Sequence, residues 1–150
     1  MANEMQDDLL LFLQLEKKIV LPGELPEAVV VLTNEGGSEL LVNARLLAVP
    51  EAYPETIGEI VFSIDGPSDS INLKVFNVNA GRAKPEDFAR LKPGETIVKN
   101  FDLNNYFRFT DPGLYKASVF YRNVIDLSYE GMESWKGELS SNVEDFEIRS

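Results

Sequence analysis

The segment Asp111-Pro112-Gly113-Leu114-Tyr115-Lys116-Ala117-Ser118-Val119 constrains the fold more than any other part of the chain. It opens with a turn, because Pro112 fixes φ and Gly113 adopts positive φ at little steric cost. An alternating segment follows directly, as expected of a strand whose successive side chains point to opposite faces. We therefore predict a strand after this turn. Its buried face consists of Tyr115, Ala117, Val119 and Tyr121.

The rest of the chain carries the same type of signal, namely short apolar or β-branched segments separated by turn residues. No segment shows the sustained apolar period of about 3.6 residues that an amphipathic helix needs. We expect strands at 9–20, 28–33, 40–49, 59–64, 71–78, 96–103, 114–122 and 135–148. We further expect a hairpin over 59–78, one short helix within 81–91, a tight irregular or 3₁₀ turn over 104–110, a polar loop over 124–134 and a bulge near Asn142. The pattern predicts an all-β antiparallel sandwich of about seven to nine strands, formed by a single domain over residues 1–150.

Several short motifs in the second half carry a resemblance to a known family. A tyrosine two residues before a core position of a late strand resembles the tyrosine corner of immunoglobulin-like sandwiches. The accompanying motifs are Leu91-x-Pro93-Gly94-Glu95, Asp102-Leu103-Asn104-x-Tyr106 and Trp135-x-Gly137-x-x-x-Ser141-Asn142. Together they resemble the immunoglobulin-like domains of many bacterial secreted and surface proteins. They are also similar to the non-catalytic domain that precedes the protease domain in deuterolysin-type metallopeptidases.

This resemblance covers about residues 27–148 and implies a structural role for Asp111, Gly113 and Tyr115 at the corner. In the immunoglobulin fold the second cysteine of the inter-sheet disulfide would lie where this chain has Ala117. The protease half of the metallopeptidase family needs a His-Glu-x-x-His helix, and this chain contains no histidine. The resemblance therefore implies a sandwich with a binding or structural role, without the protease activity.

The composition removes most catalytic chemistry. With neither cysteine nor histidine, the chain lacks disulfides, thiolate ligands, thiol nucleophiles and the commonest general base. No Gly-x-Ser-x-Gly motif surrounds any serine, and acidic pairs that are merely close in sequence within exposed turns do not provide the fixed pair of carboxylates that a glycosidase needs. We predict a non-enzymatic protein with no catalytic residues and no cofactor.

The net charge of −11 argues against nucleic-acid binding and against attraction to an anionic membrane surface. Residues 9–13 are apolar, but the run is too short to span a membrane and follows two acidic residues instead of basic ones. We expect no membrane insertion, and the missing export signal favours a cytoplasmic location. The acidity is explained by solubility, with a basic partner or calcium as the more specific alternatives.

Two acidic turns are candidates for calcium, because hard oxygen ligands suit this ion. Asp65 and Asp69 form one pair, and Asp126 and Glu130 form the other. Neither turn has the spacing of an EF-hand loop. We expect at most weak Ca²⁺ binding and no bound transition metal.

Binding through surface complementarity is the function that remains. Tyr53 and Tyr129 lie in expected loops, over 50–58 and 124–134, and Trp135 follows the second loop. Loops on a rigid scaffold commonly carry recognition, so these aromatic residues are the candidate contacts, although Trp135 is equally suited to covering a sheet edge. We predict a non-catalytic protein–protein interaction or assembly module. A carbohydrate-binding module and a small proteinaceous protease inhibitor are the alternatives.

The first strand suggests how such a module meets its partner. Residues 9–13 are apolar on both faces, and Pro and Gly at positions 22, 23 and 26 interrupt pairing further along. We expect this strand at a sheet edge, with its surplus apolar face covered by a protein partner or by a second copy of the chain. The alternative is that residues 9–13 only fill one end of the core.

Overall fold

The computed structural model describes residues 8–50, 58–67, 72–73 and 81–150. In this part of the chain all regular structure is β-strand apart from two 3₁₀ turns, Pro85–Asp87 and Leu103–Asn105, so the predicted all-β class is confirmed. One sheet has the order β1(Leu9–Leu15), β3(Glu27–Asn34), β9(Thr96–Asp102). The other has the order β2(Ile19–Val20), β15(Glu144–Ile148), β11(Gly113–Asn123), β6(Ile60–Asp65), β5(Ala48–Pro50), and β14(Gly137–Ser140) also pairs with β11.

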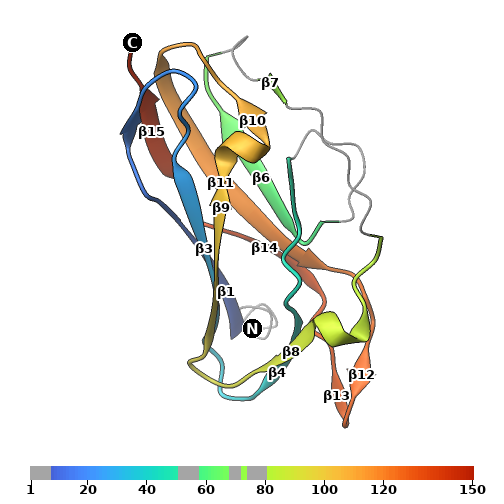
Figure 1. Cartoon of the computed structure of the whole chain (residues 1–150). Coiled ribbons are helices and arrows are strands. Elements are labelled where there is room, and N and C mark those ends of the chain that lie inside the picture. Colours follow the sequence, from blue (N-terminus) through green and yellow to red (C-terminus); the bar gives the residue numbers. More distant parts are fainter. Residues whose placement is uncertain (1–7, 51–57, 68–71, 74–80) are drawn as a thin grey trace.

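Three two-stranded ribbons complete the described architecture (Figure 1). They are β4(Leu40–Asn43) with β8(Phe88–Leu91), β7(Asn72–Leu73) with β10(Phe107–Arg108), and β12(Ser128–Tyr129) with β13(Met132–Glu133). Most pairings are antiparallel, but β2 pairs with β15 and β5 pairs with β6 in parallel, so the larger sheet is mixed.

The two larger sheets share one apolar core. Strand β1 buries every second residue, and β11 does the same on the facing sheet. The core side chains of these two strands are Leu9, Leu11, Leu13, Leu15, Tyr115, Ala117, Val119 and Tyr121. The predicted burial of Tyr115, Ala117 and Val119 is therefore confirmed, and the period of two in the sequence is the cause.

The corner at the start of β11 fixes the position of this strand. The Tyr115 hydroxyl donates a hydrogen bond of 2.7 Å to the carbonyl oxygen of Asp111, four residues upstream. The ring stacks between Phe109 and Phe146, with both centroid distances 5.1 Å. Gly66 lies against the same ring so closely that a Cβ there would come within 2.1 Å of a ring carbon. The turn, the hydroxyl and the aromatic stack together hold the tyrosine where the sequence predicts it.

Two predictions for the middle of the chain, the strand over 40–49 and the hairpin over 59–78, differ from the structure. The segment 40–49 is divided into β4 and β5, which belong to different sheets, because Leu46 has a φ of 52° that no strand residue adopts. The predicted hairpin over 59–78 is contradicted where it is described, since Asn72–Leu73 form β7 and pair with β10, while 68–71 and 74–78 lie outside the described residues. Both edges of β6 are already taken, one by β11 and the other by β5.

The segment 9–20 is likewise divided, into β1 in one sheet and β2 in the other. The short helix predicted within 81–91 is a single 3₁₀ turn followed by β8. The loop 124–134 contains the ribbon β12–β13, whose turn is formed by Glu130 and Gly131, both with positive φ. With these divisions the described residues hold fifteen strands, several of only two residues, instead of about seven to nine.

The predicted bulge near Asn142 lies where the last strand is interrupted. β14 and β15 both pair with β11, and residues 141–143 between them are not strand, although Ser141 still hydrogen-bonds to Val119 of β11. The side chain of Asn142 reaches across to the first strand of the other sheet. Its Oδ1 accepts from the Leu13 amide at 2.8 Å, and its Nδ2 donates to the Leu13 carbonyl at 3.0 Å. One amide thereby joins the edges of the two sheets.

A buried polar network joins the larger sheet to the segments around it. The buried carboxylate of Glu59 accepts from Arg45 through both oxygens, with Nε–Oε1 at 3.0 Å and Nη2–Oε2 at 2.9 Å. It also accepts from the Asn43 side chain at 3.2 Å and from the Leu47 amide at 2.9 Å. Asn43 donates further to Asn123 at 3.1 Å. The network satisfies a carboxylate that would otherwise be costly to bury.

The phenol of Tyr121 belongs to the same network, donating to the Asn43 carbonyl at 2.8 Å. Burial, and secondarily the negative charge of Glu59, raise the pKa of Tyr121 far above its usual value of 10.0. The folded state therefore strongly prefers the neutral phenol.

We expect Tyr115→Phe to lower the free energy of unfolding by about 1–2 kcal/mol, because it leaves the Asp111 carbonyl without its partner. Urea denaturation measures this change. The matched control is Tyr129→Phe, whose side chain is exposed, and it should alter stability by less than about 0.5 kcal/mol. Equal effects of the two substitutions would contradict a structural role for the corner hydrogen bond.

We expect alkaline pH to destabilise the fold through Tyr121. A raised pKa in the folded state means that its contribution is fully present below about pH 10, the unfolded pKa, and is lost as pH rises through the folded pKa. Denaturation midpoints measured from pH 8 to 11 should fall more steeply for the natural chain than for Tyr121→Phe. Parallel pH profiles would show that Tyr121 does not sense this ionisation.

Candidate functional site

The side of the β1–β3–β9 sheet that faces away from the core is apolar. In the strand register Phe12 lies opposite Val31, and Val31 lies opposite Val98. Leu10 lies on the same side of β1 as Phe12, and Val29 lies on the same side of β3 as Val31. We call Leu10, Phe12, Val29, Val31 and Val98 the outer face. Exposed fractions of 47% for Leu10, 50% for Phe12 and 57% for Val98 show that solvent reaches it. Single exposed apolar residues are common, whereas a contiguous group on one sheet surface marks an interaction site.

Four polar, uncharged residues lie directly beside the outer face. Thr33 and Thr96 are paired with each other beside Leu10, and Gln14 and Asn100 flank Val29. These side chains offer hydrogen bonds without the desolvation cost of a charge. A partner surface can therefore cover the whole centre without burying an unpaired ion.

Acidic residues border the outer face at one end. Glu27 and Asp102 are paired across β3 and β9, and Glu16 lies opposite Glu27, with its amide donating to the Glu27 carbonyl at 2.9 Å. Strand alternation directs all three side chains to the same side as the outer face. We call Glu16, Glu27 and Asp102 the acidic row.

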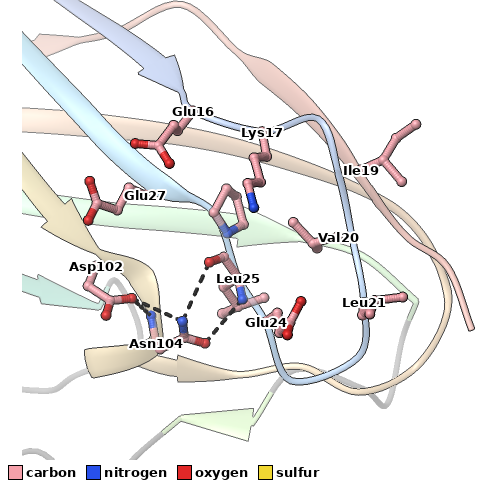
Figure 2. Close-up of a pocket in the computed structure, with 11 residues that line it drawn as sticks. Glu16, Lys17, Ile19, Val20, Leu21, Glu24, Leu25, Glu27, Asp102 and Asn104 are labelled. Atoms are coloured by element: carbon pink, nitrogen blue, oxygen red, sulfur yellow. Dashed lines mark hydrogen bonds between the residues drawn. The ribbon is translucent and has the colours of Figure 1, made fainter.

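A pocket of about 500 Å³ opens beside the acidic row. Figure 2 shows the carboxylates of Glu16, Glu27 and Asp102 on one side of it, with the apolar side chains of Ile19, Val20 and Leu21 on the other. Glu24 and Lys17 also line it, so four carboxylates are accompanied by one ammonium group. The pocket is negative, with an apolar wall.

Asn104 holds the wall of this pocket in place. Its side chain accepts from the Leu25 amide at 3.1 Å and binds the Asp102 carboxylate at 3.0 Å. The negative charge of Asp102 also acts on Tyr106. Burial is the larger cause that raises the pKa of the Tyr106 phenol, and the charge of Asp102 is the second. The carboxylates are too dispersed to act as one metal site, since the described residues contain no group of three or more acidic side chains that could hold an ion.

Two of the three sequence-predicted contact residues, Tyr129 and Trp135, lie in the described part of the chain. Tyr129 is 55% exposed on β12, but the Arg90 guanidinium lies 5.8 Å above its ring centroid. Trp135 is half-buried and packs against Tyr121, with ring centroids 5.6 Å apart. Tyr53 lies outside the described residues.

Three of the four calcium candidates, Asp65, Asp126 and Glu130, lie among the described residues. Glu130 pairs with Arg90 at 2.6 Å, and Asp126 lies 3.4 Å from the Lys136 ammonium. Asp65 is exposed at the end of β6, and Asp69 lies outside the described residues. Of these acids, the two in 124–134 have basic partners in place of further carboxylates.

The sequence contained part of the signal for the outer face. Residues 9–13 are apolar on both sides, and β1 lies at a sheet edge among the described strands, as predicted. The segment Ala28-Val29-Val30-Val31-Leu32 is also apolar on both sides, a pattern usual for strands covered on two faces. Only the register places Val29 and Val31 beside Phe12.

No protein-family model matches the chain, and no curated protein matches its sequence. In the part of the chain that the structure describes, no helix is long and apolar enough to cross a membrane.

We expect the outer face to be dispensable for folding. Replacing Leu10 and Phe12 together by threonine, a good strand former, should lower the free energy of unfolding by less than about 1 kcal/mol. Leu13→Ala on the opposite side of β1 should cost about 2–5 kcal/mol, because Leu13 is fully buried. Binding of a hydrophobic fluorescent dye should fall in the double variant. A large loss of stability there would show that the outer face supports the fold.

Proposed function

We propose that this chain is an immunoglobulin-like β-sandwich that acts as a non-catalytic protein-interaction module. The strand orders β1-β3-β9 and β2-β15-β11-β6 support the immunoglobulin-like assignment, because a first strand that pairs with one sheet and continues into the other is consistent with this topology. The corner at Tyr115 supports it as well. The absence of cysteine and histidine supports a non-catalytic role.

The partner binds on the outer face. The observation that carries this proposal is an exposed, uncharged and apolar sheet surface, Leu10, Phe12 and Val98 foremost, in a chain of net charge −11. Charged residues are depleted from the centre of protein interfaces, and aromatic residues are enriched there. Phe12 is the central anchor of this surface.

The chemistry of the partner follows from the charge around the outer face. Its contact surface is apolar at the centre and basic at the end that meets Glu16, Glu27 and Asp102. A second copy of this chain is a poorer match, because it presents the same acidic border and the same net negative charge. A sugar is also a poorer match, since Arg90 covers one face of Tyr129 and Trp135 packs against the core.

Site-specific photo-crosslinking tests the proposal. A benzoylphenylalanine at position 12 of the full chain, expressed in its native cell, should crosslink to one discrete protein. The control carries the crosslinker at Leu114, which is 73% exposed on the other sheet, and should not capture that protein. Crosslinking only to a second copy of the chain, or equal capture from both positions, would overturn the proposal.

Calorimetry with the purified captured protein provides the quantitative test. Phe12→Lys should abolish detectable binding, and Glu27→Lys should weaken it by about tenfold, or about 1.4 kcal/mol. The weakening by Glu27→Lys should diminish at high salt, because screening removes the attraction it acts on. Leu114→Lys, which changes the charge by the same amount as Phe12→Lys, should leave the affinity unchanged.

A further inference from the structure

A second pocket, of about 390 Å³, has the opposite charge to the rest of the molecule. Of the described residues that line it, Arg45, Arg82 and Arg122 are basic and Glu59 is acidic. It lies at the start of β6 and the end of β11, and the segment that precedes the Pro85–Asp87 turn supplies its third side. In a chain with 25 acidic and 14 basic residues, three guanidinium groups around one pocket are unexpected.

The buried network already accounts for one of the three positive charges. Arg45 and Glu59 form a bidentate ion pair, and both side chains are largely buried. Arg82 and Arg122 are different. In the described part of the chain neither of them has a carboxylate within ion-pair distance, and Arg122 donates only through Nε, to the Gly58 carbonyl at 3.3 Å. Among the described residues, the pocket therefore carries two guanidinium groups, those of Arg82 and Arg122, that no carboxylate pairs with.

The remaining lining is apolar. Val124 is 79% exposed at the rim, and Ile125 and Ala83 complete the wall. Asn123, which follows Arg122, is held rigidly by hydrogen bonds from its side chain to the Ile125 and Trp135 carbonyls. The end of β11 is thus fixed by the fold before any ligand arrives, which lowers the entropic cost of binding.

We propose that this pocket binds a carboxylate carried on a small apolar group. Guanidinium groups match the planar geometry of a carboxylate, and the apolar wall accepts the body of the ligand. A phosphate would satisfy the charge but leave the wall uncovered. The same chemistry occurs in a free organic acid and at the C-terminal residue of a peptide. This site is independent of the outer face and of its partner.

Calorimetry with defined probes tests the proposal on the full chain. The probes are N-acetyl-leucine, its amide, and a hexapeptide that ends in leucine with a free carboxylate. The free-carboxylate probes should bind, and the amide should bind at least about tenfold more weakly, as expected when a hydrogen bond to a charged group is lost. Tighter binding of the hexapeptide than of N-acetyl-leucine identifies a peptide terminus as the source, and equal binding identifies a small acid.

Matched variants locate the binding. Arg82→Gln and Arg122→Gln should each weaken binding of N-acetyl-leucine by about tenfold. Arg90→Gln removes the same charge away from the pocket and should leave the affinity unchanged. Thermal melting confirms that the variants are folded. Arg45 is not substituted, because its loss would leave Glu59 buried without a counter-charge.

Several results would overturn the proposal. They are no heat of binding with either carboxylate probe, equal affinity for the amide, or equal weakening by Arg90→Gln. Retained affinity in the folded double variant of Arg82 and Arg122 would do the same. Stronger binding of inorganic phosphate than of both carboxylate probes would replace the proposed ligand class.

Discussion

The buried ion pair of Glu59 and Arg45 is the interaction on which the arrangement of this molecule depends. A buried carboxylate is tolerated only where several hydrogen-bond donors surround it. For Glu59 these donors are Asn43 at the end of β4, and Arg45 and the Leu47 amide in the segment between β4 and β5. The same network reaches β11 through Asn123 and Tyr121. The network thus brings β4, the segment that follows it, Glu59 and the end of β11 together. The arginine-lined pocket lies where these segments pack.

The parts of the fold that were predictable from sequence are those decided by neighbouring residues. The turn at Gly113, the alternation along β11 and the hydroxyl contact of Tyr115 all involve residues within a few positions of one another. The failures involve competition between distant strands. The residues of 59–78 do not indicate that β5 and β11 occupy both edges of β6. The residues next to Leu46 do not indicate that its φ is positive. Pairing is a property of the whole chain.

The same distinction holds for the candidate sites. Leu10 and Phe12 were identifiable from 9–13 alone. An edge strand with apolar residues on both sides buries one side in the core and leaves the other side exposed. The acidic row and the arginine-lined pocket were not, since their members come from separate strands that only the tertiary register brings together. The loop aromatics Tyr129 and Trp135 stay predicted contacts, and sequence does not show that Arg90 and Tyr121 lie against them.

The Asn142 amide has a consequence for how the chain behaves at high concentration. An edge strand offers its backbone donors and acceptors to any passing strand, and runaway stacking of this kind is how β-proteins form fibrils. By occupying both the donor and the acceptor of Leu13, Asn142 acts as a one-residue mimic of a neighbouring strand. The first strand thus exposes its apolar side chains on one side while its edge backbone is occupied at Leu13, near its middle.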